Sequence, residues 1–139
     1  MIQVVLDTNV IISGLVFIGP PRLILKHVIE GDIKLCISEE IIDEDEVKGV
    51  LEEKKFNYTP EITAIIRREL ISISKLINPR KKLKIIEKDP KDNMVLECAL
   101  EGQVNYIVSG DTHLLELKRF QDITIVKPSD FIKILKRQL

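Results

Sequence analysis

The feature that most constrains the fold is a short apolar run, Ile2 to Leu6, which ends in a single carboxylate, Asp7. Runs of this length and β-branched content are typical of buried strands in parallel sheets. The carboxyl end of such a strand lies at the edge where open α/β sheets bind ligands. Because burying an unpaired charge is costly, we expect Asp7 either to bind a cation or to cap a helix.

The same pattern returns late in the chain. The apolar run from Val104 to Val108 is followed by the polar turn Ser109 to Thr112, which holds Asp111. Two more groups of carboxylates, Glu39 to Glu44 and Asp89 to Asn93, stand at predicted helix starts. Two strand ends and two helices of one α/β domain can bring these carboxylates to a single cleft.

Helical and strand-like segments alternate along the chain, and capping residues and glycines mark helix starts and ends. The sequence predicts helices over 22–30, 38–53, 60–77, 90–101 and 114–117 and from 128 onward, and strands over 2–6, 33–37, 104–108 and 123–126. Residues 83–86 are predicted as a short strand or an extended connection. Strands separated by helices indicate a three-layer α/β/α sandwich with a central parallel sheet.

Composition limits the class of protein. The 139 residues fit one domain, and 45% hydrophobic and 31% charged residues suit an ordinary core and a solvated surface. No apolar stretch approaches the ~20 residues of a transmembrane helix, and the first residues lack a signal-peptide pattern. Cys36 and Cys98 have no C-x-x-C spacing and lie in apolar contexts, which predicts reduced core thiols. We therefore expect a cytoplasmic protein with no membrane segment.

Each group of carboxylates also has a simpler explanation at a helix start. Asp92 can be an acid in the first turn of a helix, and Asp111 can be the N-cap of the short helix after it. The acids of 39–44 can be a solvated helix start. Asp7 fits this explanation least, because the apolar run Val10 to Ile12 does not resemble a solvated first turn. The arrangement of all four groups at element junctions favours a shared site over four separate caps.

Metal chemistry suits such a cluster. Carboxylates without a convergent histidine or cysteine are hard oxygen ligands of the kind that Mg²⁺ and Mn²⁺ prefer. Such ions activate water and stabilise charge at a phosphoryl centre. The net charge of −1 does not itself indicate nucleic-acid binding. An acidic pocket in a nearly neutral chain is still compatible with phosphate chemistry, because a divalent ion offsets the local repulsion.

Four segments together resemble the motifs of the PIN domain family, in the family's order: Val5 to Val10, Ser38 to Glu44, Asp89 to Asn93, and Ile107 to Asp111. The resemblance spans almost the whole chain, and within the family the chain looks most similar to the VapC-type toxins of toxin–antitoxin pairs. The resemblance implies a single PIN-like nuclease domain over 1–139 with a compact α/β/α sandwich.

The resemblance also implies the residues of a catalytic site. One or two Mg²⁺ or Mn²⁺ ions would be held there, and water would attack an RNA phosphodiester in line. The implied metal ligands are one helix glutamate and three aspartates, Asp7, Asp92 and Asp111. Thr8, Asn9 and Ser109 would orient the carboxylates or the water.

The helix glutamate is the least determined of these ligands. Counting from Ser38 selects Glu44, and counting back from Val50-Leu51 selects Glu46. These two glutamates lie about 200° apart on one helix, so they cannot both face a metal. We favour Glu44, because apolar residues share its helix face, and Glu40, one turn earlier, is a further candidate.

Partners are expected to be single-stranded RNA, an antitoxin protein and a second copy of the chain in a homodimer. The basic run Arg80 to Lys84 is interpreted as a solvated loop, with contact to an RNA backbone as the alternative. His113 is interpreted as a surface histidine, with contact to substrate or metal as the alternative. The helix predicted over 60–77 is apolar around much of its circumference, so it is either core or a dimer surface.

Three alternatives fit part of the pattern. A phospho-acceptor receiver domain has a similar size and a Lys-Pro like Lys127-Pro128, but Asp7 lacks the adjacent acid that this class needs. A haloacid-dehalogenase phosphatase needs a second aspartate where Asn9 stands. An inactive PIN fold could serve as an RNA- or protein-binding module, but all four acid positions are filled. We therefore interpret the chain as a metal-dependent endoribonuclease.

Overall fold

The computed structural model describes residues 1–42, 49–53, 56–87 and 89–139. A six-stranded sheet in the order β3-β2-β1-β4-β6-β5 forms its centre. The strands are β1 (Gln3–Leu6), β2 (Lys34–Ile37), β3 (Lys75–Leu76), β4 (Tyr106–Val108), β5 (Arg119–Phe120) and β6 (Ile123–Val126). Neighbouring strands pair in parallel except β5 and β6, which are antiparallel. The expected central parallel sheet is confirmed, with one antiparallel strand added at its edge.

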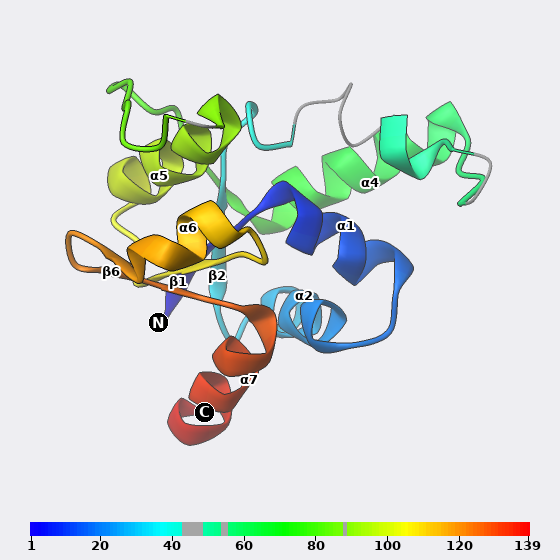
Figure 1. Ribbon diagram of the computed structural model, residues 1–139. Coiled ribbons are helices and arrows are strands. Elements are labelled where there is room, and N and C mark those ends of the chain that lie inside the picture. The colour runs from blue at the N-terminus through cyan, green and yellow to red at the C-terminus, as the bar shows by residue number, and fades with distance from the viewer. Residues whose placement is uncertain (43–48, 54–55, 88) are drawn as a thin grey trace.

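Helices cover both faces of this sheet, as Figure 1 shows. They are α1 (Thr8–Val16), α2 (Pro20–Glu30), α4 (Pro60–Ile73), α5 (Pro90–Gly102), α6 (Thr112–Leu117) and α7 (Pro128–Gln138). In the view of Figure 1, α5 and α4 lie above the sheet, and α2 and α7 lie below it. Phe131 of α7 packs on Tyr106 of β4 with ring centroids 5.4 Å apart. The predicted α/β/α layering is therefore confirmed.

The two strand ends that carry candidate site residues lie side by side. Leu6 of β1 is opposite Val108 of β4, so Asp7 and Ser109 follow at the same edge of the sheet. The Asp7 backbone N–H donates to the Val108 carbonyl, and the Ser109 N–H donates to the carbonyl of Val126 in β6, each at 3.0 Å. Three adjacent parallel strands thus fix the backbone from which both side chains project.

The largest departure from the predicted pattern is the end of the helix over 60–77. Helix α4 ends at Ile73, and Ser74 takes an extended backbone conformation. Lys75 and Leu76 then pair in parallel with the end of β2 as the edge strand β3. Apolar spacing continues through this segment, but pairing with an open strand edge replaces the last helical turn. Similarly, β5 was not predicted, and the apolar run after Asp7 belongs to α1.

Ser38 begins the segment predicted as a helix over 38–53. Its hydroxyl accepts a hydrogen bond from the Ile41 backbone N–H at 3.3 Å, but residues 39–42 form a turn in place of the predicted first helical turn. Both glutamates weighed as the helix ligand, Glu44 and Glu46, lie outside the described residues.

No single helix in the described part of the chain is long and apolar enough to cross a membrane. Only when α1 and α2 are taken together do they have the length and apolar composition of a membrane-spanning segment, and the chain bends by 92° between them. Cys36 and Cys98 are both buried and free, as predicted. Burial raises the pKa of the Cys98 thiol to about 12, which keeps it protonated.

Candidate metal centre

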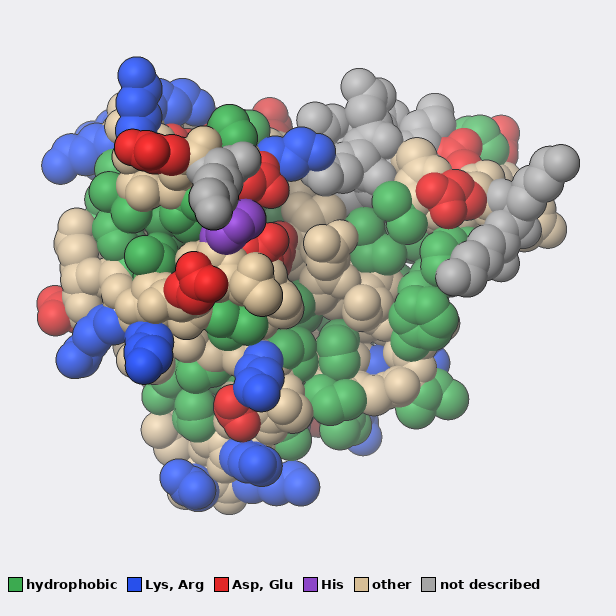
Figure 2. All heavy atoms as spheres, viewed as in Figure 1, with side chains coloured by type: hydrophobic (Ala, Val, Ile, Leu, Met, Phe, Trp, Pro, Cys, Tyr) green, Lys and Arg blue, Asp and Glu red, His purple; other side chains and the backbone are tan. Residues whose placement is uncertain are grey.

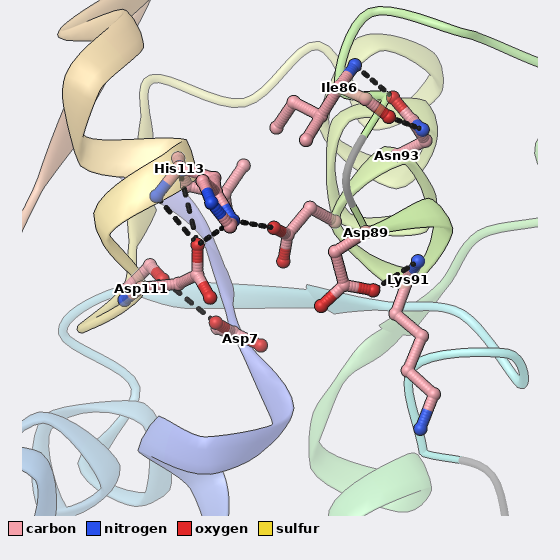
Figure 3. Close-up of polar contacts among 10 residues, drawn as sticks. Asp7, Ile86, Asp89, Lys91, Asn93, Asp111 and His113 are labelled. Atoms are coloured by element: carbon pink, nitrogen blue, oxygen red, sulfur yellow. Dashed lines mark hydrogen bonds and ion pairs between the residues drawn. The ribbon is translucent and has the colours of Figure 1, made fainter.

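Three aspartates from three separate elements line one cavity at the carboxyl edge of the sheet. Two of them, Asp7 and Asp111, are labelled in Figure 3. Asp7 follows β1, Asp92 lies in the first turn of α5, and Asp111 precedes α6. The cavity has a volume of about 180 Å³, and Glu40 and Asp89 also line it. The structure therefore brings together the three aspartates that the sequence predicts as ligands.

Asp7 occupies the N-cap position of α1, but its side chain makes no capping hydrogen bond there. Instead, the Ser109 hydroxyl donates a hydrogen bond of 2.8 Å to Asp7 Oδ2. Asp7 is only 8% exposed, and Ser109 is fully buried. Asp7 was expected either to cap a helix or to bind a cation. Its side chain does not cap α1, and its carboxylate lines the cavity.

Asp111 does cap a helix, as its simpler explanation predicts. Its Oδ1 accepts hydrogen bonds from the backbone N–H groups of His113 at 2.8 Å and Leu114 at 3.3 Å. Its own backbone N–H donates to the Ser109 hydroxyl at 2.9 Å. Capping does not remove Asp111 from the site, because the residue still lines the acidic cavity.

Asp92 does not cap α5, because that role belongs to Asp89, whose side chain accepts a hydrogen bond from the Lys91 backbone N–H at 3.0 Å. Asp92 is buried, and its Oδ2 has no hydrogen-bond partner. Burial first, and then the negative charges of Asp111, Asp89 and Asp7, raise the pKa of Asp92 from 3.8 to about 7. The fold thus holds this carboxylate where its negative charge is poorly compensated.

His113 lies beside this cluster, so the alternative of a metal contact fits the structure, while its side chain is still 36% exposed, as expected of a surface histidine. Its Nδ1 is buried without a hydrogen-bond partner, 3.8 Å from Asp92 Oδ2 and 3.6 Å from Asp111 Oδ1. Figure 3 shows the imidazole turned toward these carboxylates. The spacing Asp-x-His was a usable signal, because capping by Asp111 places the residue two positions later beside the same carboxylate.

The residues expected to orient the ligands behave differently from one another. Ser109 contacts Asp7, as described above. The Thr8 hydroxyl donates instead to the Ile41 carbonyl at 2.7 Å, which ties the start of α1 to the turn that carries Glu40. Asn9 is exposed and lines the cavity.

The donor set fits a hard divalent cation. Asp92, Asp111 and His113 can each present one ligand atom within 4.8 Å of the others. Two of those groups carry buried atoms without hydrogen-bond partners, Asp92 Oδ2 and His113 Nδ1. Carboxylate oxygens suit Mg²⁺ and Mn²⁺, and an added imidazole suits Mn²⁺ better than Mg²⁺.

Comparison with known proteins agrees with this geometry. The PIN domain family matches residues 3–113, a span that contains all three aspartates of the cavity. This chain belongs to the PIN domain family. Its fold is also similar to the crystal structure of FitAcB from Neisseria gonorrhoeae, with a TM-score of 0.54 and 19% identity over 91% of this chain and 98% of that chain. A comparison with curated proteins finds no match.

PIN domains are generally nucleases and usually bind divalent metal ions through acidic residues. Membership of this PIN domain family therefore favours the nuclease hypothesis over the receiver-domain and phosphatase alternatives. Activity itself depends on the site rather than the fold.

Proposed function

We propose that this PIN domain is a metal-dependent endoribonuclease that hydrolyses single-stranded RNA and forms one domain over 1–139. The observation that carries the proposal is the buried Asp92 carboxylate, whose Oδ2 lacks a hydrogen-bond partner and which shares a cavity with Asp7 and Asp111. Buried charges in proteins are normally paired or bound to metals. A cation held between the three aspartates would compensate all of them.

Asp7, Asp92, Asp111 and Glu44 are the proposed ligands of Mg²⁺ or Mn²⁺, with Glu44 included from its place in the motif. A bound divalent ion supplies activation of water and stabilisation of charge at the phosphoryl centre. The chain's own residues supply the preorganisation: Ser109 holds Asp7, and the start of α6 holds one oxygen of Asp111. Ligands fixed in this way need little rearrangement when an ion binds.

The test is a titration of Mn²⁺ into the wild type and Asp7→Asn, with cleavage of a labelled single-stranded RNA followed in the same samples. Asp122→Asn is a matched control, because Asp122 is exposed in the turn before β6. We expect Asp7→Asn to abolish cleavage and weaken metal binding, and the control to behave as wild type. Retained turnover in Asp7→Asn would overturn the proposal. Metal and RNA binding without cleavage in the wild type would favour the inactive binding module.

We further propose that the domain is the toxin of a toxin–antitoxin pair and forms a homodimer in the cytoplasm. The similarity of its motifs to VapC-type toxins supports the first part. The homodimer is supported by an exposed apolar face on α4. Its residues Ile62 and Ile65 are 46% and 49% exposed and have no partner in the described chain. Growth arrest on expression in a bacterial host, absent with Asp7→Asn, tests toxicity. Light scattering tests the dimer, which Ile62→Glu should dissociate.

A further inference from the structure

A second groove adjoins the acidic cavity and shares Glu40 and Met94 with it. Its volume is about 510 Å³. The apolar part of its lining comes from Leu83, Ile86, Pro90 and Met94. Lys82 and Lys84 contribute positive charge to the same lining. An RNA strand that leaves the acidic cavity on this side therefore meets an apolar surface bordered by Lys82 and Lys84 and also by three glutamates, Glu40, Glu87 and Glu97.

One wall of this groove is a segment that we call the strap, residues 82–86, which α5 holds through buried side chains. Glu97 Oε2 accepts a hydrogen bond from the Leu83 backbone N–H at 2.8 Å. Asn93 Oδ1 accepts a hydrogen bond from the N–H group of Ile85 at 3.0 Å. It also accepts from the Ile86 N–H at 2.9 Å, and Asn93 Nδ2 donates to the Ile86 carbonyl at 2.7 Å, as Figure 3 shows.

Asn93 and Glu97 lie one turn apart on α5 and are 7% and 5% exposed. Buried polar side chains of this kind commonly satisfy backbone groups of a segment without regular structure. Because Asp92 immediately precedes Asn93, the same helix fixes both the acidic cavity and the strap. The position of the strap lysines relative to the candidate metal centre is thereby set by α5.

The charges around the groove are unevenly distributed. Lys82 Nζ lies 3.2 Å from Glu40 Oε1 and 3.9 Å from Glu97 Oε1. Lys84 is exposed, and the strap follows directly after Arg80 and Lys81. Figure 2 shows Lys and Arg side chains gathered at the upper left, close to acidic groups and a histidine. Cationic groups beside an acidic cavity can offset the repulsion between its carboxylates and a phosphate backbone.

We propose that this groove binds the nucleotide next to the scissile phosphate of a single-stranded RNA, with Lys82 and Lys84 contacting phosphates and the apolar lining receiving the base. This inference rests on the proposed ribonuclease function. It assigns the strap a binding role in place of the solvated loop expected from the sequence. Bases are available to an apolar surface only when they are unpaired, so the groove selects single strands. Asn93 and Glu97 are positioning residues that act through the strap.

The first test measures binding of a short fluorescent single-stranded RNA by anisotropy in EDTA, where no metal-dependent cleavage interferes. Lys82→Ala/Lys84→Ala is compared with Lys133→Ala/Lys136→Ala, which removes the same charge from α7. We expect several-fold weaker binding in the strap variant only. Its slope of log K against log salt should fall by about 0.7 per lysine. Equal affinity and slope in the two variants would overturn the proposal.

A second test examines the positioning role of Glu97. Glu97→Gln keeps an oxygen that can accept the Leu83 N–H, whereas Glu97→Ala removes it. We expect RNA affinity to fall several-fold in Glu97→Ala and to be retained in Glu97→Gln, with unchanged Mn²⁺ affinity in both. If Glu97→Ala does not fold, Glu97→Gln carries the positioning test, since a loss of RNA affinity in this variant would overturn that role, and Lys84→Ala tests the groove. Equal losses of RNA affinity in Gln and Ala variants that both fold would overturn the positioning role.

Cleavage kinetics in Mn²⁺ separate failure of the groove from failure of the ribonuclease function. We expect the strap variant to raise KM with little change in kcat, because it removes binding rather than chemistry. Normal cleavage by the strap variant would overturn the groove and keep the nuclease. Lysine-dependent RNA binding without wild-type cleavage would support the groove and overturn the nuclease. Competition by duplex RNA as effective as that by the single strand would overturn the assignment to single strands.

Discussion

The hydroxyl of Ser109 donates a 2.8 Å hydrogen bond to Asp7 Oδ2, which joins two residues 102 positions apart in the sequence. The same hydroxyl accepts the backbone N–H of Asp111 at 2.9 Å. One buried oxygen therefore links the first and last aspartates of the candidate metal centre. The link exists because β1 and β4 are adjacent and end in register.

Ser109→Ala should weaken both the site and the fold. The substitution removes a donor from the Asp7 carboxylate and an acceptor from the Asp111 backbone, and leaving a buried polar group unpaired costs about 1–3 kcal/mol. We expect Mn²⁺ affinity to fall about 10- to 100-fold, as for other residues that orient ligands. Calorimetric metal titration and thermal unfolding measure the two effects. Ser129→Ala, on the exposed start of α7, is the control, and matching values in the two variants would contradict the prediction.

Asp92→Asn should stabilise the metal-free protein in a pH-dependent way. The pKa of Asp92 is raised to about 7 in the folded chain, whereas the unfolded carboxyl titrates near 3.8. The folded state therefore holds the proton more tightly, and the free energy of unfolding of the wild type falls as the pH rises between these values. Asparagine cannot ionise, so the free energy of unfolding of the variant does not fall with pH for this reason.

The measurement is Tm in EDTA from pH 4 to pH 8. We expect the advantage of Asp92→Asn over wild type to grow across this range to a few degrees, since ~1 kcal/mol shifts Tm by about 3–5 °C in a domain of this size. Mn²⁺ at pH 8 should raise the Tm of the wild type more than that of the variant. An advantage that stays constant with pH would show that Asp92 does not titrate in this window.

His113→Ala should change metal preference. The Nδ1 atom of His113 lies within 4 Å of oxygens of Asp92 and Asp111, so it can join them as a nitrogen ligand. Imidazole suits transition metals, whereas Mg²⁺ prefers oxygen. We expect Mn²⁺ affinity to fall roughly tenfold, which is the usual scale for an auxiliary contact, while Mg²⁺ affinity changes little. Thr112→Ala, an exposed position beside His113 on the same helix, is the control and should change neither affinity.

Glutamine substitutions can identify the helix ligand. We expect Glu44→Gln to abolish Mn²⁺-dependent cleavage and Glu46→Gln to leave it nearly unchanged, because the motif favours Glu44 and two positions this far apart on any helix would differ by about 200°. Glu40→Gln should have a smaller effect on metal affinity than Glu44→Gln, because Lys82 already neutralises Glu40 at 3.2 Å. Cleavage rates of the three variants at saturating and limiting Mn²⁺ provide the comparison. A loss confined to Glu46→Gln or Glu40→Gln would reassign the ligand.

Sequence reasoning predicted the sheet and most helices because their signals are local. Buried parallel strands show continuous apolar runs, and α4 and α5 begin at residues of capping type, Thr59 and Asp89, whose side chains accept a backbone N–H. The edge strand β3 was missed because it depends on pairing with β2, which lies about forty residues earlier. Spacing along one segment contains no information about such a distant partner.

The candidate site was only partly predictable for a related reason. Asp7 and Asp111 follow recognisable strands, so their meeting at one edge follows from parallel topology. The orientation of His113 depends on how α6 leaves Asp111, and the strap depends on Asn93 and Glu97 reaching backbone groups of another segment. Side-chain contacts to irregular backbone leave no periodic trace in the sequence, which explains why the contact of His113 and the binding role of the strap were only the less favoured alternatives.

Helix α5 places unequal evolutionary constraints on two neighbouring parts of the chain. Asp92, Asn93 and Glu97 all lie on this one helix, which rises ~1.5 Å and turns ~100° per residue. A single insertion or deletion between Asp92 and Glu97 would turn one of them away from its partners. The strap itself is held through its backbone, so its exposed side chains can change without loss of these hydrogen bonds. Substrate preference can therefore diverge among descendants of this protein while the spacing within α5 stays fixed.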